Sequence, residues 1–389
     1  MRVNSLKISG VGGIKELELD FHSGFNVICG ANGIGKTTIL NIIADSFVAQ
    51  HSALKRNASY EQASYDIEYL GADGAPHSKH QVIKEFDPES SKDGRTSSAD
   101  SLSILAFSVN RMIPYHSLPA VPKDIHREQV AAGNMLKTDI DPKELKGWFE
   151  NRILFSELSG SITAEQTSNL EVAKRAFGLL DEKVSYKTVK AGTLDIILNT
   201  QQGDIYFEYL SAGYKTCIFV VLGIIKEIEF RFTSPYIKAA DFEGVVLIDE
   251  IDLHLHPIWQ ARLVQTLKLL FPKIQFIVTT HSPSILQSMD VKELIPLTMD
   301  AEGNVAKKDL NLGEYGLQGW TIEEIMQDVM EMPATTSTLR DKIIRAFDKA
   351  MDDEDPEEIL KNYDILQQML HPNSTLKKLL EIQVAGWRE

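Results

Sequence analysis

The stretch Gly30-Ala31-Asn32-Gly33-Ile34-Gly35-Lys36-Thr37-Thr38 decides the fold of this 389-residue chain. It matches G-x-x-x-x-G-K-[ST], the pattern of a phosphate-binding loop. Glycine has no Cβ and lets successive backbone N–H groups turn toward an anion, so Gly33 and Gly35 suit this role. Lys36 can reach the β- and γ-phosphates of a nucleotide, and the Thr37 hydroxyl can bind Mg²⁺.

The residues on both sides of this loop support the same interpretation. Residues 25–29 are a short apolar run that predicts a strand, and residues 38–44 have the composition of a helix. The positive end of that helix would face the phosphates. The alternative is a chance glycine-rich turn, which the order strand, loop and helix disfavours. We therefore expect residues 30–38 to bind ATP.

The composition is that of an ordinary soluble globular protein, with 43% hydrophobic and 24% charged residues. The net charge of −15 argues against a protein that coats nucleic acid, although a local basic groove stays open. No apolar run is long enough to span a bilayer, so we expect a cytoplasmic protein without membrane contact. Cys29 and Cys217 lie in apolar stretches and are expected to be buried thiols.

Periodicity divides the chain into four parts. Residues 1–29 alternate apolar and polar side chains and predict a strand hairpin that leads into the loop. Residues 142–182 have helical spacing, and residues from 321 onward read as helices separated by prolines. The predicted domains are an N-terminal ATPase lobe (1–111), a helical insertion (112–190), a C-terminal ATPase lobe (191–310) and an acidic helical extension (311–389).

Two adjacent carboxylates, Asp249 and Glu250, follow the aliphatic run 244–248. Such a run predicts a central parallel strand that is buried on both faces. Successive side chains at a strand end point to opposite sides, so the two carboxylates can act differently. We expect Asp249 to bind Mg²⁺ and Glu250 to orient and polarise the attacking water. A strand that merely ends in a polar turn is the alternative.

Two further motifs complete the pattern. His281 ends the buried run 275–279, where it could contact the γ-phosphate or the attacking water. Ser211 and Gly213 begin a predicted helix and could offer a hydroxyl, backbone amides and a positive dipole to a phosphate. An ordinary helix N-cap explains Ser211 equally well.

Together these motifs resemble the ABC-type ATPases of the SMC, RecF and OLD class. The matching elements are G-A-N-G-I-G-K-T, L-S-A-G, V-V-L-I-D-E and T-T-H-S-P, which cover residues 1–300 in order. The run 249–257 resembles more narrowly the AAA-family ATPases of bacterial anti-phage defence operons. These include the Septu-type ATPases, which work with a nuclease partner.

The resemblance implies an α/β ATPase head with a mixed central sheet and a dimer that encloses two ATP molecules. In that arrangement Ser211 and Gly213 would bind the γ-phosphate of the other protomer's nucleotide. Lys36, Glu250 and His281 would be catalytic within one protomer, and Thr37 and Asp249 would hold Mg²⁺. The implied partners are a second copy and a separate effector, a nuclease, that docks on the helical regions.

This chain departs from the family pattern at several positions. Ala212 and Tyr214 stand where many relatives have Gly and Gln, and Asp252 is the candidate for a contact across the dimer. Asn110 and Arg111 are the candidates for the position of the glutamine loop. The insertion has about forty helical residues and no heptad pattern, which excludes a long coiled-coil arm.

The function that we expect is an ATP-driven dimer switch that controls an effector in antiviral defence. The main alternative is a DNA-repair or DNA-tethering ATPase that clamps nucleic acid. A transporter subunit is disfavoured by the insertion and the helical tail. A self-contained OLD-type nuclease is disfavoured because only about a hundred residues follow His281. The tail, with eighteen Asp/Glu against ten Lys/Arg from Ala301, is either a docking surface or a cap on the ATPase.

Overall fold

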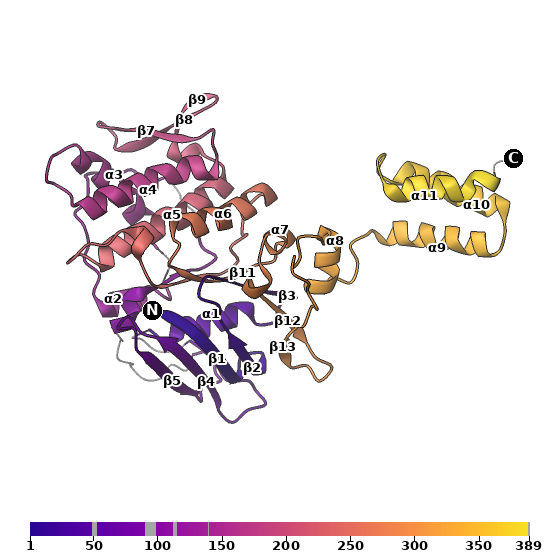
Figure 1. Ribbon diagram of the computed structural model, residues 1–389, viewed down its shortest axis with the longest axis horizontal. Coiled ribbons are helices and arrows are strands. Elements are labelled where there is room, and N and C mark those ends of the chain that lie inside the picture. The colour runs from indigo at the N-terminus through magenta and orange to yellow at the C-terminus, as the bar shows by residue number, and fades with distance from the viewer. Residues whose placement is uncertain (49–52, 90–98, 112–114, 139, 388–389) are drawn as a thin grey trace. The chain divides into compact units, whose positions relative to one another are not determined.

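The computed structural model describes residues 1–48, 53–89, 99–111, 115–138 and 140–387. These residues form two compact units, Met1–Glu331 and Met332–Glu389, which are described separately (Figure 1). Residues 112–114 and 139 of the expected helical insertion lie outside the described residues.

A six-stranded mixed sheet lies at the centre of the first unit, in the order β13-β12-β3-β11-β10-β6. The strands from β12 to β6 run parallel, and β13 pairs antiparallel with β12. The bounds are β3 Phe25–Gly30, β6 Ile104–Phe107, β10 Val245–Ile248, β11 Gln275–Thr279, β12 Leu294–Met299 and β13 Val305–Lys307. The expected mixed central sheet is therefore confirmed.

The central strands are apolar along their whole length because both faces of the sheet are covered. In β10, Val246 and Ile248 belong to one hydrophobic core, whereas Val245 and Leu247 belong to the other. Side chains alternate between the faces of a strand, so a continuous aliphatic run supplies both cores. This is why the sequence of β10 is a continuous run of apolar residues and does not alternate between apolar and polar residues.

One face of this sheet packs against α1 (Lys36–Asp45), and beyond α1 lies an antiparallel four-stranded sheet (Figure 1). The strand order in this sheet is β2-β1-β4-β5. Its bounds are β1 Arg2–Val11, β2 Ile14–Asp20, β4 Ala63–Leu70 and β5 Pro76–Ile83. β1 and β2 form the expected hairpin, with Leu6 opposite Leu19. The apolar face of α1 is thus enclosed between two sheets.

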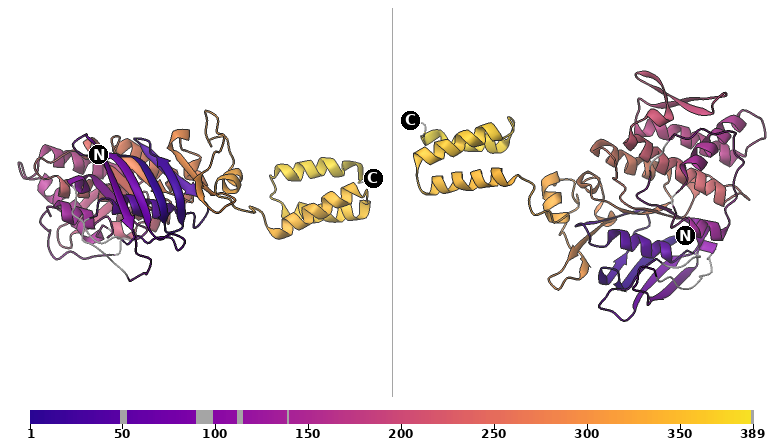
Figure 2. Two further views of the ribbon diagram at one scale, coloured as in Figure 1. Left: turned by 90° about the horizontal axis from the view of Figure 1, so that it is seen from below. Right: turned by 180° about the vertical axis from the view of Figure 1, so that it is seen from behind.

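Helices cover the opposite face of the central sheet (Figure 2). They are α3 Pro142–Ser156, α4 Ala164–Leu180, α5 Ala212–Arg231 and α6 Pro257–Leu270, with the shorter α2 Gln129–Asn134 and α7 Pro283–Leu286 nearby in the chain. A small antiparallel sheet follows α4, with β7 Ser185–Lys190, β8 Asp195–Thr200 and β9 Gly203–Tyr206. The long helix α5 contacts α3, α4 and α6, and it is buried along most of its length.

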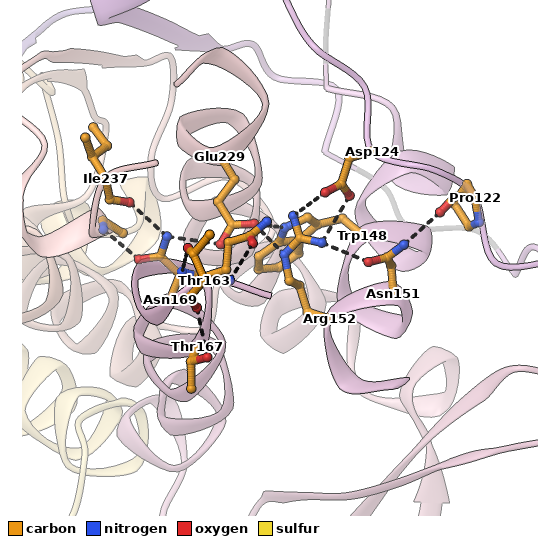
Figure 3. A network of polar contacts seen from close by, with 12 residues as sticks. Pro122, Asp124, Trp148, Asn151, Arg152, Thr163, Thr167, Asn169, Glu229 and Ile237 are labelled. Atoms are coloured by element: carbon orange, nitrogen blue, oxygen red, sulfur yellow. Dashed lines mark hydrogen bonds and ion pairs between the residues drawn. The ribbon is translucent and has the colours of Figure 1, made fainter. Parts of the chain in front are cut away.

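A polar network ties α3 and α4 to the C-terminal part of α5 (Figure 3). The Glu229 carboxylate accepts hydrogen bonds from Trp148 Nε1 at 2.8 Å, Arg152 Nε at 2.6 Å and Asn169 Nδ2 at 3.0 Å. Arg152 also binds the Asp124 carboxylate. A buried charge needs such partners to offset its lost hydration. The network therefore holds the insertion helices to α5.

The second unit is a bundle of three helices, α9 Thr338–Asp352, α10 Pro356–Met369 and α11 Thr375–Val384. Their apolar faces meet in a separate core that includes Phe347, Tyr363 and Leu380. Pro356 begins α10 as its first residue, and Asp355 caps that helix by accepting from the backbone N–H groups of its first turn. The acidic run 352–355 is therefore the turn between two helices.

Most expected elements are present, with differences at their ends. The helix expected at 321–331 is a short α8 (Ile322–Glu324) continued by a π-helical turn, Ile325–Val329, and it belongs to the first unit. β7, β12 and β13 were not expected. Within the described residues, none of the helices has both the length and the apolarity needed to cross a membrane. Cys29 and Cys217 are buried free thiols, as expected.

One buried carboxyl group in the insertion is left without a hydrogen bond. Glu150 on α3 is fully buried, and neither of its carboxyl oxygens has a partner among the described residues. Lys146, one turn earlier, is bound instead to Asp195 at 3.0 Å and to Glu208 at 2.9 Å. Burial raises the pKa of Glu150 to about 8, and the nearby Asp195 and Glu208 carboxylates add to the shift.

Replacing Glu150 with Gln should therefore change how stability depends on pH. The folded protein keeps a proton on Glu150 that the unfolded chain loses above the ordinary pKa of 4.5, so wild-type stability falls as the pH rises from 4.5 toward 8. Glutamine cannot titrate, so the melting temperature of Glu150→Gln should fall less over that range. Glu171→Gln, at an exposed pair on α4, is the control. Parallel curves for wild type and Glu150→Gln would contradict a buried neutral carboxyl group.

Candidate functional site

The glycine-rich loop connects the end of β3 to the start of α1. Gly30, Gly33 and Gly35 all have positive φ angles, of 139°, 76° and 100°, which side chains with a Cβ rarely adopt. No side chain caps the N-terminus of α1, whose N-cap is Gly35. The first N–H groups of the helix are thus left to bind an anion, and the loop fits a phosphate chain.

The other loop residues hold it in place or face outward. Ile34 is 2% exposed and belongs to the core between the two sheets, so it anchors the loop. Asn32 and Gly33 are exposed, and Ala31 and Thr38 are half-buried. A Cβ added to Gly33 would meet no atom within 4 Å, which leaves this side of the loop open.

Lys36 lies folded back over the loop. Its side-chain Nζ donates to the carbonyl oxygens of Gly30 at 3.0 Å and Ala31 at 2.9 Å, and the residue is 6% exposed. Burial lowers the pKa of Lys36, and the nearby Glu250 and Asp249 carboxylates oppose that shift. The ammonium group is therefore within electrostatic range of both acidic residues.

Thr37 and Asp249 meet although 211 residues separate them in the chain. The Thr37 hydroxyl lies 3.0 Å from both carboxylate oxygens of Asp249, and Thr279 Oγ1 donates to Asp249 Oδ1 at 2.6 Å. A hydroxyl and a carboxylate are the hard oxygen ligands that Mg²⁺ takes together with substrate phosphates and water. The donor set therefore fits Mg²⁺ bound to a nucleotide, whereas no group of three His, Cys, Asp or Glu side chains that could hold a metal occurs among the described residues.

Glu250 has a strained backbone, with φ at 46°. A left-handed conformation costs a non-glycine residue about 1–3 kcal/mol and persists only where neighbours enforce it. Here Glu250 N donates to Thr279 Oγ1 at 2.7 Å, and Ile251 N donates to Thr279 O at 2.9 Å. The Arg111 guanidinium donates to the carbonyl oxygens of Asp249 and Glu250.

Arg111 is thus a site residue whose role could not be read from the sequence. It is 2% exposed and binds the backbone on which both carboxylates are carried. Sequence reasoning marked Asn110 and Arg111 only as candidates for the glutamine-loop position. A lone arginine after a predicted strand gives no sign of which carbonyl groups it will reach.

His281 lies half-buried just beyond the end of β11. Burial lowers its pKa, and the Lys36 ammonium lowers it further, while Asp252, Glu250 and Asp249 act in the opposite direction. His281, Lys36 and the two carboxylates follow β11, β3 and β10 in the chain, so they all lie near one end of the sheet. That end is formed by the neighbouring parallel strands β3, β11 and β10.

Ser211 and Gly213 occupy the N-terminus of α5. Ser211 is exposed and caps the helix, accepting a hydrogen bond from Tyr214 N at 3.3 Å. Gly213 lies against the loop that follows β10, and a Cβ there would come within 2.9 Å of His254 O. Tyr214 is buried, and its hydroxyl donates to Phe177 O at 2.7 Å. The side chain of Tyr214, which differs from the family pattern, is therefore packed in the core and does not face a ligand.

The site thus consists of two parts. Lys36, Thr37, Asp249, Glu250 and His281 lie at one end of the central sheet, where β3, β10 and β11 end. Ser211 and Gly213 stand at the N-terminus of α5, where Gly213 lies against the loop that follows β10. The first part can hold a triphosphate with Mg²⁺ and direct a water molecule at it. The second part can offer amides and a hydroxyl to another anion.

Two family models match consecutive parts of the chain. The AAA ATPase domain matches residues 1–108, and the AAA domain described as "putative AbiEii toxin, Type IV TA system" matches residues 106–287. These models cover every motif of the site.

Similar proteins and structures are known. The chain is 40% identical to the Septu protein PtuA of Bacillus thuringiensis over 98% of both chains. It is 35% identical to the Retron Ec83 probable ATPase of Escherichia coli over 36% of this chain and 25% of that protein. Among solved structures, the SMC head domain from Thermotoga maritima aligns with a TM-score of 0.44 and 17% identity, over 80% of this chain and all of that one.

The match to the Bacillus thuringiensis protein extends over the whole length of both chains, and the family models name an ATPase domain that includes the phosphate-binding loop. This chain therefore belongs to the Septu PtuA family of ATPases.

Proposed function

We propose that this ATPase is a nucleotide-driven switch in which two copies enclose two ATP molecules. The observation that carries the hydrolysis of ATP in this proposal is the contact between Thr37 and both oxygens of Asp249 at 3.0 Å. It joins the phosphate-binding loop to the acidic strand end, as hydrolysis of a Mg²⁺-bound triphosphate requires. ATP would favour the closed pair, and hydrolysis would open it.

Each residue of the cluster has a distinct role in this proposal. Residues 30–38 surround the phosphates with backbone amides, and Lys36 neutralises charge on the β- and γ-phosphates. Thr37 and Asp249 hold Mg²⁺, which when bound offsets the charge on the phosphate oxygens. Glu250 orients and polarises the attacking water, and His281 contacts that water or the γ-phosphate.

The second copy supplies Ser211 and Gly213. Ser211 is exposed at the N-terminus of α5, and a second anion bound there would face a positive helix end. In this arrangement the helix end serves the nucleotide of the other copy and not that of its own chain. A nucleotide on one copy would therefore be completed by α5 of the other, and assembly would depend on ATP.

A separate effector completes the proposed function. The similarity to a Septu protein and to a retron ATPase supports a role in antiviral defence, in which the nucleotide state controls a nuclease partner. The three-helix unit is the proposed docking surface. Two apolar side chains on α11, Leu379 and Ile382, are 53% and 73% exposed and lie one turn apart.

Replacing Glu250 with Gln should leave ATP binding intact and slow hydrolysis by about 100-fold or more, because the carboxylate that polarises the water is lost. With ATP the variant should accumulate as a closed dimer, measured by light scattering after size-exclusion chromatography. Lys36→Ala should not bind ATP. Glu243→Gln, an exposed carboxylate just before β10, is the control. Hydrolysis by Glu250→Gln at the wild-type rate would refute the assignment of Glu250.

Mixing two inactive variants should test whether each site is shared between copies. Lys36→Ala removes nucleotide binding, and Ser211→Arg blocks the partner's phosphate. In a mixed dimer both lesions fall in one site, and the other site is intact. Random mixing should restore up to about a quarter of the wild-type sites. Activity that stays at the level of the separate variants would indicate sites contained within one chain.

Removing residues 332–389 should abolish capture of the effector without loss of ATPase activity, because the remaining residues form a compact unit of their own. The measurement is co-purification with a tagged candidate nuclease effector, together with phosphate release. Ile382→Glu should weaken capture in the full chain, whereas Gln383→Glu, at the next exposed position of α11, should not. Capture that survives the deletion would place the docking surface on the first unit.

A further inference from the structure

The loop after β10 is bound to the switch strand through Asp252. Thr280 Oγ1 donates to Asp252 Oδ1 at 2.6 Å, and the backbone N–H of His281 donates to the same oxygen at 3.1 Å. Thr280 is fully buried, and Asp252 is half-buried. Asp252 was expected to reach a second copy, but its Oδ1 is occupied within its own chain. Hydrogen bonds to a carboxylate are about twice as strong as those between neutral groups.

These contacts belong to a closed ring of hydrogen bonds. Ser282 N donates to Thr280 Oγ1 at 3.0 Å, and Ser282 Oγ donates to Gln260 Oε1 at 2.6 Å. Gln260 Nε2 donates to Leu255 O at 3.1 Å, and Leu255 N donates to Asp252 O at 3.0 Å. The ring starts and ends on the loop that carries Glu250. It therefore joins the acidic loop, the first turns of α6 and the start of α7.

The position of His281 depends on this ring. The last backbone bond between β11 and the rest of the sheet is from Thr280 N to Ile28 O at 3.2 Å. Beyond it, the N–H of His281 is held by Asp252 and by no strand partner in the described contacts. On the other side of the loop, Thr279 holds Glu250. The spacing between the two reacting side chains is thus set by neighbouring backbone contacts.

We propose that Asp252 is a positioning residue that holds His281 in register with Glu250 during ATP hydrolysis. The inference rests on the proposed function of those two residues and assigns Asp252 a role within its own chain. The Thr280 hydroxyl contributes to this positioning because it donates a hydrogen bond to the Asp252 carboxylate. A displacement of about 1 Å in a reacting group can cost about 100-fold in rate, so a small shift of His281 is sufficient.

The test compares single-residue variants of the full-length protein. Thr280→Val removes the hydroxyl, and Asp252→Ala removes the acceptor, so both should lower kcat about 10- to 100-fold. The KM for ATP should change less than about threefold, because neither residue holds the phosphates. Thr280→Ser keeps the hydroxyl and should retain most of the activity. Asp252→Asn keeps an acceptor oxygen and should lie between wild type and Asp252→Ala.

A double-mutant cycle tests whether Asp252 acts through His281. If it does, Asp252→Ala should lower kcat little further in a His281→Ala protein. Independent, multiplying effects would overturn the proposal, as would a wild-type kcat for Asp252→Ala or equal losses in Thr280→Ser and Thr280→Val. Loss of ATP-dependent dimers in Asp252→Ala but not in Thr280→Val would also overturn it, in favour of a contact with a second copy.

The proposal and the function on which it rests fail in different ways. If Glu250→Gln hydrolyses ATP as fast as wild type, the proposed function fails before the Asp252 variants are compared. If Glu250→Gln is slow but Asp252→Ala and Thr280→Val are fully active, only the positioning role fails. If Asp252→Ala folds poorly, comparing the kcat of Thr280→Val with that of Thr280→Ser still tests the positioning role. The side chains of these two variants differ little in volume from the wild-type threonine.

Discussion

The burial of β3, β11 and β10 on both faces is the constraint on which the rest of the structure depends. Parallel strands need crossover connections and a cover on each side, here α1 with the four-stranded sheet on one face and α5 with its neighbouring helices on the other. Because the strands run parallel, their carboxyl ends meet at one edge. The phosphate-binding loop, the acidic pair and His281 therefore come together without any proximity in sequence.

The positions of Asp249 and Glu250 at that edge are fixed by local hydrogen bonds that the strands alone do not supply. Thr279 serves the site from two directions, since its hydroxyl donates to Asp249 and accepts from Glu250 N. Arg111 holds the same turn from the side of β6. Such contacts compensate for the left-handed backbone at Glu250. The turn that bears Glu250 is thus held in place at a modest cost in stability, which the surrounding core offsets.

The helical layer on the sheet contacts the loop that follows Asp249 and Glu250. α5 begins at Ala212, with Gly213 against the 250–256 loop, and ends among the buried charges that bind α3 and α4 (Figure 3). Gly213 permits the close approach of this helix to His254 O. The insertion and α5 are therefore one packed layer.

The sequence by itself determined the fold class, the phosphate-binding loop and the strand that bears Asp249 and Glu250, because these depend on local patterns. The aliphatic run of β10 requires burial on both faces, and glycines are the residues that permit the positive φ angles of a tight phosphate-binding loop. Short strands such as β13 were not foreseen, since three residues carry no usable period. Only the tertiary structure decided that Arg111 holds the acidic turn, that Tyr214 packs inward and that Asp252 binds Thr280 and His281. These contacts join residues far apart in the chain, and the type of a side chain does not specify which distant group it will meet.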